Sequence, residues 1–223
     1  MTTTPQRDAA PNRGFGLFVD RAVHRLATHW LAIVNLCWAL YVGLPVLAPV
    51  LMNAGWETPA KIIYTVYRPA CHQLPERSYF LGGPKVAYSE KELQAGGVET
   101  GPPSRHIGNE TVGWKVAFCQ RDVAIYGSIF LAGLAYGLIR RCRGNWLMPF
   151  KVYLIFLVPM GIDGLLQLFG LHQSDWLLRT ITGAFFGAGS VLFAYPYLDQ
   201  GFADVRNSVS KRLYPESPEK PVE

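Results

Sequence analysis

Charged side chains are missing from three long stretches of this 223-residue chain. None occurs from Trp30 to Met52, from Val123 to Ile139 or from Thr180 to Leu198. A fourth apolar run, from Val152 to Leu171, contains the single charge of Asp163. A helix needs about 17 to 25 apolar residues to cross the hydrocarbon core of a bilayer. These absences exclude an ordinary soluble domain and predict four membrane crossings.

Cysteine is scarce, and no two of the four cysteines are spaced as Cys-x-x-Cys. The commonest sequence signature of a zinc or thiol-redox site is therefore missing. Cys71 and Cys119 nevertheless fall in the same long segment between the first two predicted crossings. A disulfide, a metal site and thiol–disulfide exchange are all compatible with that placement in an outer, oxidising compartment.

The net charge of +5 comes from basic residues that gather beside the apolar runs. Lys and Arg are absent from the link 170–176. Basic residues concentrate on the cytoplasmic side of membrane proteins. This distribution favours a multi-pass protein of the bacterial plasma membrane with both termini inside, and argues against nucleic-acid binding. The basic flanks comprise Arg7, Arg13, Arg21 and Arg25, then Arg140, Arg141, Arg143 and Lys151, then Arg206, Lys211 and Arg212.

We therefore predict an all-α membrane protein, a four-transmembrane-helix bundle with N-in/C-in topology and the lipid bilayer as its main partner. An amphipathic helix with apolar residues at helical spacing precedes the first span, which we expect to act as an uncleaved anchor. The expected parts are a disordered tail (1–14), a membrane domain (15–200) with spans at 30–52, 122–140, 147–169 and 178–198, an outer loop (53–121) and a cytoplasmic tail (201–223).

Two other features bear on organisation. Residues 82–113 are rich in Gly, Pro and polar residues, which predicts a loop with little regular structure. Small residues four apart let helices approach closely in lipid. Gly133 with Gly137 and Gly183 with Gly187 therefore predict packing faces, used either within the chain or in a homodimer or larger complex.

Asp163 is the anomaly in the third span, because an unpaired carboxylate in hydrocarbon costs several kcal/mol. Gln167 shares its helix face, and Arg179 begins the fourth span at a similar depth. We expect Asp163 and Arg179 to form an interhelical ion pair. The alternative is an outward-facing pocket with these residues as its floor and the 71–77 segment as its roof.

The outer segment supplies the remaining candidates. Cys71 and His72 are adjacent, and Cys119 precedes Arg121 and Asp122. Thiolate, imidazole and carboxylate are ligands for Zn²⁺ or another transition metal. A Cys71–Cys119 disulfide is the structural alternative. Arginine recognises carboxylates and phosphates in a bidentate way, so Arg77 and Arg121 join Asp163, Gln167 and Arg179 as ligand-binding candidates.

The chain resembles a family of prokaryotic predicted integral membrane proteins of unknown function, domain of unknown function 2085. The resemblance rests on Cys71-His72-Gln73-x-Pro75-x-Arg77-Ser78, on Cys119-x-Arg121-Asp122, and on Asp163-Gly164 with Gln167 and Arg179. Family members often have a second cysteine where this chain has Asp122, and they join the first two motifs by a shorter link. The resemblance implies membrane location and a candidate site, and it implies no reaction or cofactor.

Three functions follow as hypotheses. The leading one is a non-enzymatic membrane protein whose outer polar cluster binds a small ligand, a lipid headgroup or a metal. The second is a membrane thiol/quinone oxidoreductase that uses Cys71 and Cys119. The third is a small ion-coupled transporter with Asp163 as the coupling acid, which the absence of an internal repeat disfavours.

Overall fold

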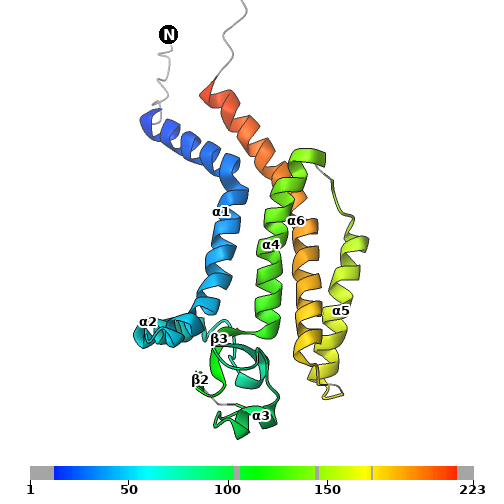
Figure 1. The fold of residues 1–223 in the computed structure, drawn as a ribbon. Helices are drawn as coiled ribbons and strands as arrows, with labels where there is room; N and C mark the ends of the chain where they lie inside the picture. Colours follow the sequence, from blue (N-terminus) through cyan, green and yellow to red (C-terminus); the bar gives the residue numbers. More distant parts are fainter. Residues whose placement is uncertain (1–12, 103–105, 144–145, 172, 215–223) are drawn as a thin grey trace, which may run out of the picture.

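The apolar stretches form four long helices in the computed structural model, which describes residues 13–102, 106–143, 146–171 and 173–214. All four are long and apolar enough to cross a membrane. The predicted all-α membrane bundle is therefore confirmed. The helices are α1 (Arg13–Asn53), α4 (Gln120–Arg143), α5 (Phe150–Leu168) and α6 (Trp176–Leu213), arranged as in Figure 1.

The structure describes only part of each predicted tail. The predicted disordered tail, 1–14, lies outside the described residues apart from the start of α1. The first part of the predicted tail 201–223 is the continuation of α6 as far as Leu213, and the rest lies outside the described residues. The amphipathic segment before the first span belongs to α1, which continues without a break from Arg13 to Asn53.

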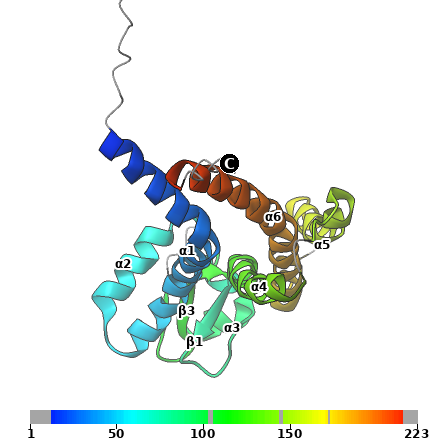
Figure 2. The same cartoon turned by 90° about the horizontal axis from the view of Figure 1, so that it is seen from above.

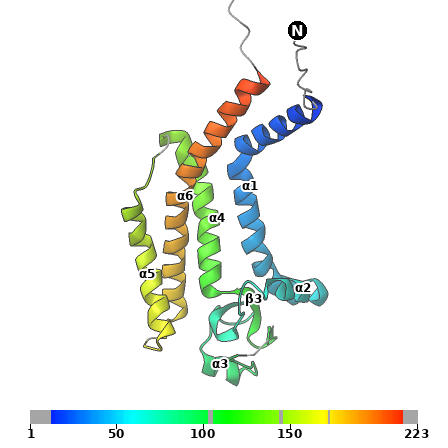
Figure 3. The same ribbon diagram turned by 180° about the vertical axis from the view of Figure 1, so that it is seen from behind.

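Helix α6 organises the bundle, because it packs against α1, α4 and α5. Helix α5 lies at the periphery, as Figures 2 and 3 show. Most of its large apolar side chains are exposed, among them Ile155 and Leu168. These apolar side chains can face lipid, and the backbone of the helix needs no water there because it satisfies its own hydrogen bonds.

Both glycine pairs pack inside the chain. A Cβ at Gly187 would lie 2.4 Å from the Ile125 carbonyl oxygen, and one at Gly183 would lie 3.0 Å from that of Arg121, both on α4. A Cβ at Gly133 would lie 2.1 Å from Asn35 Oδ1 on α1. Of the two uses predicted for these faces, the packing within the chain is the one that the structure has. A homodimer or larger complex through Gly133/Gly137 and Gly183/Gly187 stays a prediction.

The 53–121 segment and the far ends of the helices mark two ends of the bundle, which we call outer and inner. At the inner end, Asp199 of α6 accepts hydrogen bonds from Trp30 Nε1 of α1 (3.1 Å) and Arg140 of α4 (2.6 Å). The carboxylate therefore connects the three central helices.

In the described part of 82–113, predicted as a loop with little regular structure, the regular elements before the strand at 113 are a six-residue helix (90–95) and a two-residue strand (108–109). The outer segment as a whole is nevertheless a small folded domain. Its strands form a sheet in the order β1–β3–β2, with both neighbours antiparallel. Phe80, Leu93, Val98 and Val112 form a core of their own beneath α3. The elements of this outer domain (residues 54–119) are α2 (Glu57–Tyr67), η1 (Pro75–Arg77), β1 (Ser78–Leu81), α3 (Glu90–Ala95), β2 (Gly108–Asn109) and β3 (Gly113–Cys119).

Local sequence explains why the 82–113 segment folds. Ser89 and Glu92 form a reciprocal capping box at the start of α3, which satisfies backbone donors that would otherwise lack partners. Gly108 (φ +118°) at the start of β2 and Gly113 (φ +85°) at the start of β3 have a backbone conformation that residues with a Cβ rarely adopt. The composition that predicted a loop therefore supplies the turns of a sheet.

Candidate functional site

The site forms where β3 runs directly into α4. Cys119 ends the strand opposite Ser78 of β1, and Gln120 begins the helix. Gln120 is buried, and its Nε2 donates to the Ser78 carbonyl oxygen at 3.1 Å. The register of the sheet therefore brings the Cys119 motif beside the end of the motif that contains Cys71 and Arg77.

The loop that carries Cys71 is held by a ring of buried hydrogen bonds. Gln73 has a left-handed φ of +52°, which is strained for a residue with a Cβ. Its side chain donates to the Tyr64 carbonyl oxygen (2.9 Å), and its own carbonyl accepts from Lys115 Nζ (2.5 Å). Tyr64 closes the ring by donating to the Lys115 carbonyl oxygen (2.5 Å). Burial lowers the pKa of Lys115 to about 8.

Cys71, Cys119 and Asp122 bring their sulfur and carboxylate atoms within 4.8 Å of one another. Both cysteines are buried and free. The Cys119 backbone amide donates to Cys71 Sγ at 3.2 Å. The Cys119 thiol also donates to Cys71, which lowers the pKa of Cys71 and, together with burial, raises the pKa of Cys119 far above its usual range. Two ionised thiols and a carboxylate at this separation repel one another unless a cation lies between them.

Asp163 is buried on α5 and forms an ion pair with Arg121 of α4. The expected partner, Arg179, instead donates to Gln120 Oε1 at 3.2 Å. The prediction of Arg179 as the partner of Asp163 is therefore wrong, because the guanidinium that contacts this carboxylate belongs to Arg121 in the first turn of α4. The predicted interhelical pairing of the aspartate does exist.

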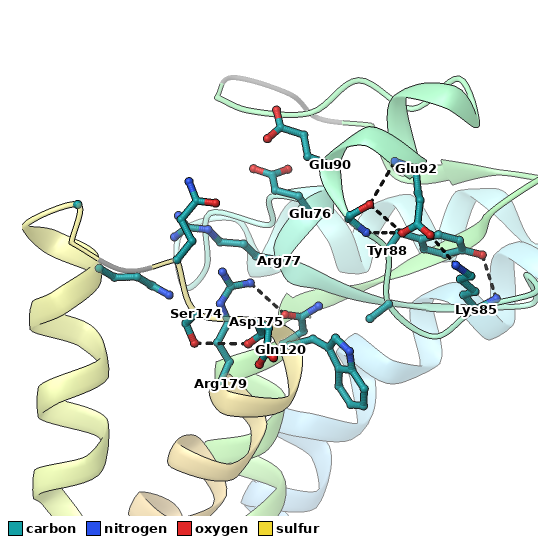
Figure 4. Close-up of a pocket in the computed structure, with 16 residues that line it drawn as sticks. Glu76, Arg77, Lys85, Tyr88, Glu90, Glu92, Gln120, Ser174, Asp175 and Arg179 are labelled. Carbon is teal, nitrogen blue, oxygen red and sulfur yellow. Dashed lines mark hydrogen bonds and ion pairs between the residues drawn. The ribbon is translucent and has the colours of Figure 1, made fainter.

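Two neighbouring cavities open beside this pair. The smaller, of about 260 Å³, is lined by the three cluster residues, by His72 and Ala70, and by Arg77, Arg121, Gln167 and Arg179. The larger, of about 720 Å³, separates the outer domain from the ends of α5 and α6 (Figure 4). Arg77, Gln167 and Arg179 line both. The α3 region, including Tyr88 and Glu92, forms the far wall of the larger cavity.

The structure thus brings seven of the eight site candidates of the sequence to the lining of the smaller cavity, and the eighth, Asp163, pairs with Arg121, which lines it. His72 lines the cavity but is not part of the three-residue cluster, in which Asp122 is the third member. Its Nδ1 accepts a weak hydrogen bond from the Leu74 amide at 3.4 Å, and burial lowers its pKa. Lys115 within β3 and Gln120 at the start of α4 were not predicted, because nothing in the local sequence distinguishes these polar residues as buried.

Four apolar helices, with a small folded domain over one end and polar residues gathered between them, define a multi-pass membrane protein. The chain belongs to the family described as predicted membrane protein DUF2085, whose profile matches residues 110–193. It is 30% identical to an uncharacterised protein of Methanocaldococcus jannaschii over 142 residues, which make up 63% of this chain and 71% of that relative. No solved structure matches the chain. Membrane location is therefore shared with a family of unknown function.

Proposed function

We propose that this protein binds a transition-metal ion of the Zn²⁺ class at the outer end of its bundle, with Cys71, Cys119 and Asp122 as ligands. The observation that carries the proposal is the approach of three ligand atoms, from two distant segments, to within 4.8 Å of one another. Two thiolates and a carboxylate are a ligand set that Zn²⁺ accepts.

The surroundings support a metal site open on one side. Zn²⁺ usually takes four ligands, and sites with three protein ligands leave one position for water or an exogenous ligand. The cluster lines the smaller cavity, so that position would face it. His72 lines the same cavity, and the lowered pKa keeps its imidazole in the neutral form that binds metals. A bound cation would also relieve the repulsion among the three acidic groups.

The test is the metal content and Zn²⁺ affinity of the purified protein. Wild type should hold one Zn²⁺ per chain, and Cys71→Ser, Cys119→Ser and Asp122→Asn should each lose most of it. Cys37→Ser and Cys142→Ser are matched controls, because both thiols are exposed and lie outside the cluster. A content far below one ion per chain after Zn²⁺ loading, or retention by all three cluster variants, would contradict the proposal.

Thiol redox chemistry is the second candidate, and the proximity of two buried thiols beside a cavity favours it. Oxidation would join Cys71 Sγ to Cys119 Sγ and release two electrons and two protons, which a membrane quinone would take up to become a hydroquinone. Reversible loss of both thiols on mixing with a soluble quinone, without metal in the preparation, would favour this function over the metal site.

An ion-coupled transporter finds less support in the geometry. Its coupling acid would be Asp163, whose carboxylate is already paired with Arg121. An acid that takes up and releases ions must be free of such a partner during part of its cycle. We therefore give priority to the outer cluster.

A further inference from the structure

Two arginines near the outer ends of the helices have no carboxylate partner in the part of the chain that the structure describes. Arg77 of η1 and Arg179 of α6 line both cavities, and Figure 4 shows them extending into the same space. Among the ion pairs of the described residues, Arg121 belongs to Asp163, and neither Arg77 nor Arg179 takes part in one. Both are half-buried. Two like charges in a partly desolvated site are unfavourable without an anion.

The nearby acidic groups have other roles. Glu92 pairs with Lys85 and completes the α3 capping box. Asp175 accepts from the Leu178 amide as the N-cap of α6. Glu76 accepts from the Gly101 amide at 3.4 Å. Each of these carboxylates thus has a partner in its own wall of the larger cavity, and none of them forms an ion pair with Arg77 or Arg179.

The two guanidinium groups are also held in place. Arg179 donates to Gln120, which donates to the Ser78 carbonyl oxygen, so a chain of hydrogen bonds connects α6 to the sheet. Arg77 directly precedes the same strand, β1. Arg179 Nε and Gln167 Nε2 are buried donors with no partner among the described residues. Buried donors without a partner are rare in folded proteins and call for an explanation.

We infer that Arg77 and Arg179 bind a phosphate group in the smaller cavity, between the outer domain and the ends of α5 and α6. Guanidinium forks match the oxygens of a phosphate, and two of them from opposite walls balance the charge of a phosphomonoester. The larger cavity provides room for the remainder of the ligand. The site lies where α4 and α6 begin, at the end of two apolar helices where a lipid headgroup could reach it, and its phosphate belongs either to a lipid or to a soluble molecule.

The first test is binding of inorganic phosphate to the detergent-purified protein, compared with chloride at equal ionic strength. Hydrogen bonds to charged groups contribute about 1.5–3 kcal/mol each, so Arg77→Gln and Arg179→Gln should each weaken binding about tenfold or more. Arg68→Gln is the matched control, because this exposed arginine of the outer domain lines neither cavity and should leave binding unchanged.

A second measurement uses the wild-type protein and does not depend on the folding of variants. Phosphate should protect Arg77 and Arg179 from phenylglyoxal, read by mass spectrometry, while Arg68 stays reactive. The lipid arm repeats the protection in nanodiscs with and without phosphatidic acid, in phosphate-free buffer. Protection by phosphatidic acid, with or without protection by inorganic phosphate, identifies a headgroup, and protection by inorganic phosphate alone identifies a soluble ligand.

Absence of protection in both arms, or phosphate binding that survives both arginine substitutions, would overturn the inference. The metal proposal is tested separately, because Cys71→Ser protein freed of metal should still bind phosphate. Wild-type protein that binds phosphate but takes up no Zn²⁺ would therefore reject only the metal site, and wild-type protein that holds Zn²⁺ but binds no phosphate would reject only the phosphate site.

Discussion

Asp163 shows how a single acid is accommodated in an apolar helix. Its side chain is 3% exposed, and Arg121 at 21% exposure supplies the compensating charge. Asp163 Oδ1 and Arg121 Nε nevertheless have no hydrogen-bond partner among the described residues. The pair therefore neutralises charge without satisfying every polar atom, which makes it sensitive to the loss of either member.

We predict that Asp163→Asn destabilises the protein by about 3 kcal/mol, because it leaves the Arg121 charge partly buried without a counter-ion. The double variant Asp163→Asn/Arg121→Gln should recover part of that loss, since both charges are removed together. The measurement is the thermal midpoint of unfolding in detergent. Equal midpoints for the wild type and Asp163→Asn would show that the ion pair contributes nothing to stability.

Lys115 makes the free energy of unfolding depend on pH. Its pKa falls from 10.5 in the unfolded chain to about 8 in the buried site. Below pH 8 the amine is charged in both states, and the cost of burying that charge is fully present. As the pH rises from 8 to 10.5, the folded state loses its proton first, so this group's contribution to stability increases by an amount on the order of 3 kcal/mol.

The expected outcome is a stability difference, wild type minus Lys115→Met, that increases with pH across this window. Taking the difference cancels other groups that titrate there, such as exposed tyrosines. The measurement is the thermal midpoint of both proteins from neutral pH upward. A difference that is constant with pH would mean that Lys115 does not carry a buried charge at neutral pH.

At the scale of elements, α4 and α6 depend on small residues at their contact. A Cβ at Gly187 would lie 2.1 Å from Ser128 Oγ and 2.4 Å from the backbone of Ile125, so any side chain forces the helices apart. In lipid the hydrophobic effect does not drive helices together, and close van der Waals packing carries more of their association.

We predict that Gly187→Leu lowers the stability of the bundle by about 1–3 kcal/mol or prevents its assembly, because overpacking displaces α6 from α4. Gly161→Leu on α5 is the matched control, because nothing lies within 4 Å of a Cβ built there. Detergent-resistant folding and the thermal midpoint report the effect. Equal thermal midpoints for the two variants would show that Gly187 does not lie at a close contact between α4 and α6.

At the scale of the whole molecule, the side of the membrane on which the outer domain lies is still a prediction. The basic flanks of the spans predict that both termini lie inside. Cys142 follows at the inner end of α4, and Gln173 lies in the link between α5 and α6 at the outer end. Both are exposed. The two positions therefore provide reporters for opposite sides of the membrane.

In intact cells, a membrane-impermeant maleimide should label a Gln173→Cys protein that lacks the native cysteines, and should not label a protein with Cys142 as its single cysteine. Permeabilised cells should label both, which controls for the reactivity of each thiol. Labelling of Cys142 in intact cells would reverse the topology and place the proposed site in the cytoplasm.

Several features of the fold could be predicted because they depend on composition along one segment. Asp163 could be recognised as an acid that needed a partner, and the glycine pairs as packing surfaces. The identity of the partner could not, because Arg121 and Arg179 both begin a span at the outer end. Which of them reaches α5 depends on how α4 and α6 are rotated. The small sheet was missed because its Gly-rich turns have the composition of a loop.

The sequence by itself determined that this chain lies in a membrane with four apolar helices, since burial in lipid requires only length and apolar side chains. It also marked the two cysteine segments as candidates. Only the tertiary structure decided that Asp122 rather than His72 joins the two thiols, and that Arg77 and Arg179 share two cavities. Those relations join segments more than forty residues apart, and they depend on the pairing of β1 with β3 and on the packing of α4 against α6.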